Sequence, residues 1–115
     1  MSGDEKLLRL SAMAGMVLDV RSAALSRLAA ERDALKAQLA ALNAPRATEG
    51  LAPAAAAQVR FDYETWASRR RAELNLKIAA KHAEWLSHLD ETRQAFGRAQ
   101  VLDRMLQATR NRRSG

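Results

Sequence analysis

The fold is decided by the stretch from Leu18 to Leu42, which reads LDVRSAALSRLAAERDALKAQLAAL. Two series of positions with a seven-residue period run through it, and six of their eight members are leucine. Arg21 and Arg32 hold the other two positions. Such a repeat predicts an α-helix that packs against a second helix along a coiled-coil seam. The expected seam leucines are Leu18, Leu25, Leu28, Leu35, Leu39 and Leu42.

The first helix is expected to begin at about Asp4 and to end at about Leu42. Asp4 and Glu5 suit the positive end of the helix dipole. Upstream of Leu18 the heptad becomes irregular, which indicates a local stutter of the seam. A cluster of helix terminators then predicts a connection over about residues 43–53. The shifted seam positions are Leu10, Met13, Val17 and Val20, and the terminators are Asn43, Pro45, Gly50 and Pro53.

A second, longer helix is expected over about residues 54–112. Pro53 suits a helix start, and the apolar residues that follow recur mostly at steps of three, four, seven or eight. The sequence therefore predicts an all-α protein, residues 1–115, in which two long helices form one antiparallel coiled-coil hairpin. The second helix is expected to place Trp66, Leu74, Ile78 and Trp85 on the seam.

The unequal helix lengths predict an overhang. At 1.5 Å per residue the two helices span roughly 58 and 88 Å, so a pair that starts at the loop ends opposite about residue 92. Residues 93–115 would then be unpaired and suited to enter the groove of a partner. Pairing within a homodimer is the alternative. The expected partner-binding residues are Arg93, Phe96, Arg98, Leu102, Arg104 and Leu106.

The sequence contains no recognisable catalytic, cofactor or metal site. Cysteine is absent, which excludes disulfides and thiolate ligands. His82 and His88 are six residues apart and would face nearly opposite sides of a helix, so they could not share a metal. No nucleophile triad or phosphate-binding loop is present. We therefore expect a non-enzyme.

The chain is also expected to be soluble and cytoplasmic. Its acidic, polar start does not resemble a secretory signal, and its most apolar stretch, between Leu10 and Val20, is interrupted by polar residues and is too short for a membrane span. The net charge of +6 suggests an acidic protein surface, nucleic acid or anionic lipid as partner. Basic and acidic residues are interleaved, so a nucleic-acid-binding hairpin is a secondary alternative.

The arrangement resembles the FliJ/YscO family of central-stalk proteins in flagellar and type III secretion export. The resemblance rests on a short cysteine-free chain, a leucine-heptad first helix with surface arginines, a longer second helix, and the terminal block AQVLDRML at residues 99–106. It implies a hairpin whose termini insert into a hexameric export ATPase and which also contacts the membrane export gate.

In that arrangement Arg93, Arg98 and Arg104 would face acidic loops of the ring, and Leu102 and Leu106 would supply apolar contact. The protein would then lie in the cytoplasm, peripheral to the export apparatus. A self-associating coiled-coil scaffold or assembly factor is the main alternative, and an enzyme of an unrecognised kind is a further one.

Overall fold

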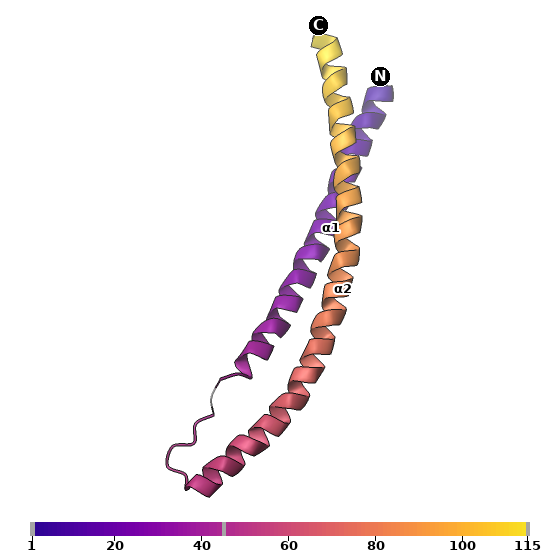
Figure 1. Cartoon of the computed structure of the whole chain (residues 1–115). Helices are drawn as coiled ribbons and strands as arrows, with labels where there is room; N and C mark the ends of the chain where they lie inside the picture. The colour runs from indigo at the N-terminus through magenta and orange to yellow at the C-terminus, as the bar shows by residue number, and fades with distance from the viewer. Residues whose placement is uncertain (1, 45, 115) are drawn as a thin grey trace. The chain divides into compact units, whose positions relative to one another are not determined.

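The chain forms two long helices. The computed structural model describes residues 2–44 and 46–114, and no strand occurs among them. Helix α1 spans Ser2–Ala41 and helix α2 spans Pro53–Ser114, as Figure 1 shows. All four helix ends lie within two residues of the expected positions. The predicted all-α fold is confirmed.

The contacts divide the chain into two compact units. Unit 1 joins Met1–Leu28 to Glu84–Gly115, and unit 2 is the continuous segment Ala29–Ala83. Each unit therefore contains a part of α1 and a part of α2, which lie side by side and run in opposite directions (Figure 1). The antiparallel helical hairpin with a longer second helix is confirmed.

The seam of α1 follows one heptad without interruption. Every described residue at the two seam positions is buried or half-buried, and this holds upstream of Leu18 as well. The predicted stutter is wrong. The small residues Ser11 and Ala14 continue the heptad and face α2, whereas the larger apolar residues next to the seam positions are exposed. Leu10, Met13, Val17 and Val20 are 50, 57, 47 and 69% exposed. The α1 seam is Asp4, Leu7, Ser11, Ala14, Leu18, Arg21, Leu25, Leu28, Arg32, Leu35, Leu39 and Leu42.

The seam of α2 is an equally strict heptad, although polar residues hold several of its positions. Ala67 is fully buried on this seam, whereas the preceding Trp66 is 55% exposed. The expected seam position of Trp66 is therefore wrong: its ring lies on the flank, 5.7 Å from the ring of Tyr63. The shielded positions are Ala67, Arg71, Leu74, Ile78, Lys81, Trp85, His88, Thr92, Ala95, Ala99, Leu102, Leu106 and Thr109.

The core is thin. Among the described residues only seven hydrophobic side chains are buried, and Leu74 is the one large side chain that is fully shielded. Three of the seven are alanines, which bury little apolar area each. The fold therefore depends on helix propensity and on a few leucines. The buried residues are Leu28, Leu42, Ala56, Ala67, Leu74, Ala95 and Leu106.

The extra length of α2 lies at the loop end of unit 2. The Tyr63 hydroxyl donates a 3.0 Å hydrogen bond to the carbonyl of Leu42, and Arg71 reaches the same oxygen at 3.5 Å. In unit 1, Asp4 near the start of α1 is paired with Arg113. The expectation that residues 93–115 overhang is therefore wrong. That expectation assumed that the two helices pair from the loop onward. Instead the loop runs along the first part of α2, where Arg46 lies 4.9 Å above the Tyr63 ring.

Candidate protein-interaction site

Unit 1 brings the two ends of the chain together. The carboxylate of Asp4 pairs with the guanidinium of Arg113, and the N and C labels lie at the same end of Figure 1. Both side chains are partly exposed, and such surface ion pairs contribute about 0–1 kcal/mol. The ion pair thus shows which residues of α1 and α2 lie side by side. Most of the stability of the helix pair comes from the seam.

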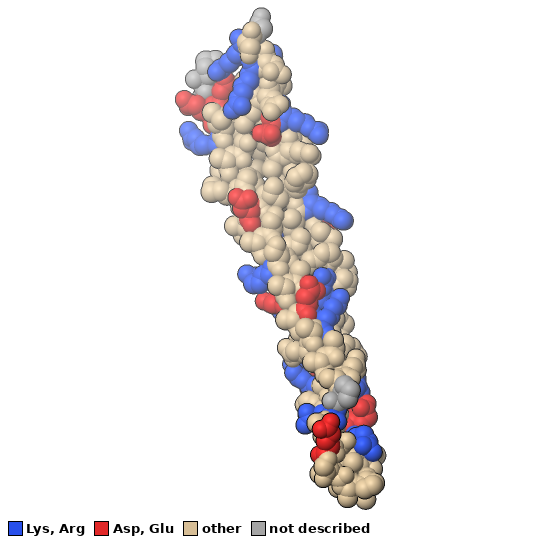
Figure 2. Space-filling view, turned by 90° about the vertical axis from the view of Figure 1, so that its left-hand side faces the viewer, with Lys and Arg blue, Asp and Glu red and all other residues tan. Residues whose placement is uncertain are grey.

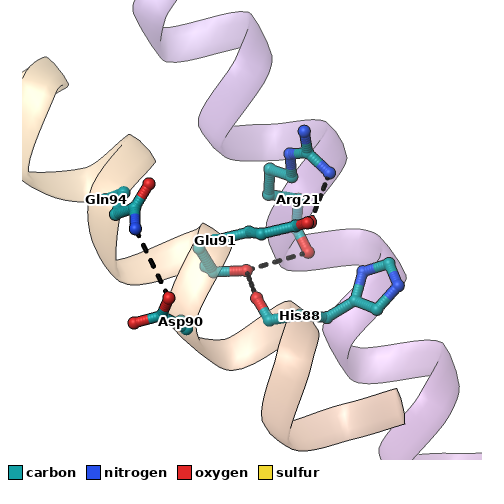
Figure 3. Close-up of polar contacts among 6 residues, drawn as sticks. Arg21, His88, Asp90, Glu91 and Gln94 are labelled. Carbon is teal, nitrogen blue, oxygen red and sulfur yellow. Dashed lines mark hydrogen bonds and ion pairs between the residues drawn. The ribbon is translucent and has the colours of Figure 1, made fainter.

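A polar cluster joins the helices in the middle of unit 1 (Figure 3). Arg21 Nη1 donates to Glu91 Oε2 at 2.6 Å. The Thr92 hydroxyl lies 2.6 Å from the His88 carbonyl in its own helix and 3.4 Å from the Arg21 carbonyl. A hydroxyl has one proton to donate, so the shorter contact within α2 is the stronger bond. Arg21 holds a seam position in α1, and its guanidinium pairs with Glu91 at the exposed edge of the seam.

His88 points toward α1 in this cluster, as Figure 3 shows. Its Nδ1 atom is buried and has no hydrogen-bond partner among the described residues. A buried unsatisfied polar group costs about 1–3 kcal/mol. No set of three or more His, Asp or Glu residues in the described ranges is arranged to hold a metal ion. His88 is thus a seam residue with an unsatisfied ring nitrogen.

The expected partner-binding residues do not share one face. Arg93, Arg98 and Arg104 are exposed, and Phe96 is 53% exposed. Leu102 and Leu106 instead lie on the seam, where Leu106 is 9% exposed. The structure separates them because the heptad positions 95, 99, 102 and 106 face α1. The leucines therefore serve the helix pair, and the arginines and Phe96 are the residues that a partner can reach.

Each flank of unit 1 carries a shallow groove. On one flank, Phe96 and Gly15 share a groove of about 310 Å³ that also contains Leu18 and Ala99. On α2 a second groove, of about 570 Å³, is lined by Gln94, Gly97, Arg98, Val101 and Leu102. Both grooves are open, so they suit a protein side chain rather than an enclosed small molecule.

Exposed apolar side chains of α1 and α2 lie on the side of the second groove. We name them the apolar flank. This surface was not expected from the sequence, because four of its members had been predicted to lie on the seam. Extending the heptad strictly upstream from Leu18 would have placed them one residue before each seam position, on the outside. The apolar flank consists of Leu10, Met13, Met16, Val17, Val20, Val101 and Met105.

Unit 2 presents a mixed aromatic and charged surface near the loop. Phe61 and Trp66 are 68% and 55% exposed, and Arg46, Tyr63 and Trp66 line a common groove. The 2.6 Å hydrogen bond from Arg71 to Glu64 raises the pKa of the Arg71 guanidinium; partial desolvation opposes this, and the charges of Glu64 and Tyr63 add to it. Arg71, a cation like every arginine at neutral pH, therefore lies at the end of α1, where it reaches the Leu42 carbonyl.

Charges of both signs are interleaved over the face that Figure 2 draws, without a continuous basic track. In residues 2–44 and 46–114, neither helix has an apolar run sufficient to cross a bilayer. No family model, curated protein or solved structure matches the chain. The exposed surfaces of each unit are therefore the features that bear on function.

Proposed function

We propose that the chain is a non-catalytic coiled-coil component of a flagellar or type III protein export apparatus, and that unit 1 inserts its paired termini into the ring of a hexameric export ATPase. The supporting observation is the pairing of the first turn of α1 with the last turn of α2 in unit 1, marked by Asp4 and Arg113. Two helices side by side measure about 20 Å across, since each is about 10–12 Å wide. A shaft of that width suits the pore of a protein ring.

Charge supports the same orientation. From Arg104 to Ser114, α2 contains four arginines and no acidic residue. Arg104, Arg110 and Arg112 are exposed. Basic side chains at the tip would steer it toward acidic loops and set the register of the complex, because charge complementarity governs association rate and specificity. The export gate is proposed as a further contact.

The test measures ATP turnover by a purified flagellar-type export ATPase with and without the full chain. The tip variant carries Arg104→Glu, Arg110→Glu and Arg112→Glu. We expect the wild-type chain to raise turnover and the tip variant to lose that effect. The matched control carries the same charge change in unit 2 at three exposed residues, Arg60→Glu, Arg69→Glu and Lys77→Glu.

This design avoids deleting residues 93–115, which would leave α1 unpaired in unit 1. Turnover that the wild-type chain leaves unchanged would refute the proposal. Equal losses from the tip and control variants would also contradict it, because net charge and not the tip would then be responsible.

A second candidate function is a self-associating coiled-coil scaffold. The specific observation in its favour is the apolar flank of unit 1, which a solitary helix pair leaves in water. A nucleic-acid-binding role receives less support, because the interleaved charges in Figure 2 offer no continuous track for phosphates.

A further inference from the structure

The apolar flank is large for a surface that faces only water. Its seven side chains are between 47 and 69% exposed. Together they present on the order of 700 Å², whereas the largest apolar patch of a typical monomer is about 300–600 Å². Scattered exposed apolar residues need no explanation, but these residues are concentrated in unit 1 at heptad spacing.

The parts of the flank on α1 and α2 belong to one side of the helix pair. Leu10, Met13, Val17 and Val20 each precede an α1 seam position by one residue, and Val101 and Met105 do the same on α2. In an antiparallel pair, residues that follow seam positions meet on one side and residues that precede them meet on the other. Gly15 and Phe96 both follow seam positions and line one groove. The preceding residues therefore form a joint surface on the opposite side.

Gly97 makes a notch in this surface. It lies inside α2 and lines the groove together with Gln94, Arg98 and Val101. A Cβ atom built on Gly97 would meet nothing within 4 Å, and glycine in a helix interior costs about 1 kcal/mol relative to alanine. Packing inside the chain therefore does not require a glycine here, and the free space opens outward onto the flank.

We propose that the apolar flank binds a second copy of this chain in an antiparallel arrangement, so that two unit 1 helix pairs form a four-helix bundle. A stable interface buries about 800 Å² per partner, which the flank and its polar rim can supply. The flank spans both helices, which matches another helix pair of equal width. In a two-fold dimer the same patch serves both copies, and side chains of the partner can enter the Gly97 notch.

Charges of both signs lie around and within the flank. Lys6 precedes a seam position and Arg112 continues the same spacing at the terminal end of unit 1, Glu84 and Glu91 precede seam positions at the other end, and Arg98 precedes Ala99 in the middle. On α2 an antiparallel pair sets Arg112 of one copy against Glu84 of the other, which is favourable, whereas on α1 it sets Lys6 against Arg27, which is not. Arg27 also lies at the second end, and Glu91 pairs with Arg21. The apolar area therefore supplies the affinity, and the crosslinking experiment below tests the direction.

This inference is separate from the proposed ATPase contact. Ring insertion would cover the same residues of unit 1, so dimer and ring complex would exclude each other. The oligomeric state of the purified chain tests dimerisation without any ATPase. Failure of one proposal is therefore distinguishable from failure of the other.

The test is sedimentation equilibrium of the full chain at micromolar concentrations. We expect a dimer, and we expect Met13→Glu and Gly97→Leu each to raise its Kd by about tenfold or more, equivalent to about 1.4 kcal/mol. Gly97→Leu fills the notch. The variant should still fold, since leucine favours the helix and a side chain at residue 97 would meet nothing else in the chain. Leu76→Glu is the control, because Leu76 is 74% exposed in unit 2. Circular dichroism checks that each variant is helical.

Crosslinking tests the direction, because the chain has no native cysteine. In the antiparallel dimer the cysteine of Met16→Cys lies near the two-fold axis and forms a disulfide with the same cysteine of the other copy. The cysteine of Lys6→Cys lies far from the axis and forms no disulfide. Disulfide formation by Lys6→Cys would overturn the antiparallel arrangement. A monomer at all concentrations, or a dimer that both flank variants leave intact, would overturn the interface. If the chain is monomeric and needs Met13 to bind a different protein, that protein and not a second copy is the partner of the flank.

Discussion

Replacing Leu74 by alanine tests whether the thin core carries the stability of the fold. Leu74 is 1% exposed and is the one large side chain fully buried among the described residues. The substitution removes three carbon groups at about 0.8 kcal/mol each, or about 2.4 kcal/mol of lost burial. The cavity left behind raises the expected loss of unfolding free energy to about 3 kcal/mol. For a small domain this is a large share of the total.

Leu76→Ala is the matched control. Leu76 lies two residues away in the same helix and is 74% exposed, so both variants make the same change in helix propensity and differ in burial. We expect Leu76→Ala to change the unfolding free energy by less than about 0.5 kcal/mol. Urea unfolding followed by circular dichroism measures both, at a fixed protein concentration because association would add to stability. Equal losses in the two variants would refute the assigned seam.

Three further substitutions have expected effects on the urea midpoint. His88→Leu should stabilise the chain by about 1–3 kcal/mol, because it removes a buried nitrogen without a partner; a loss of stability would show that Nδ1 is satisfied. Gly15→Ala should stabilise by about 1 kcal/mol, since its Cβ would meet nothing within 4 Å, and no gain would indicate an occupied groove. Gly50→Ala should destabilise by roughly 1–2 kcal/mol, because Gly50 has φ 81°; an unchanged midpoint would mean that the loop adapts freely.

Much of the fold could be predicted because α1 repeats leucine at seam positions and because Pro53 and its neighbours break the helix. The register of α2 could not be found from apolar residues, since Arg71, Lys81 and His88 hold seam positions. Long side chains such as those of Arg71 and Lys81 can cover a seam with their methylene groups while the charge reaches water. An apolar pattern does not detect this arrangement.

The interaction surface was harder to predict than the fold. Near the N-terminus, Leu10 and Met13 are more apolar than Ser11 and Ala14, so a hydrophobicity pattern selects the wrong pair of series. The continued heptad decides the seam instead, because a helix cannot change register without a local change in its winding. The position of the extra length depended on the path of the loop, which composition does not determine.

The small seam residues of unit 1 have a mechanical consequence. Ala14 on α1 and Ala99 on α2 hold seam positions at the same level of the pair, so the two helix axes can approach there to the lower end of the usual 8–10 Å separation. The resistance of a rod to bending falls steeply as it becomes thinner. We therefore expect a compliant waist just inside the chain ends, where a sideways load bends the helix pair before it separates the helices.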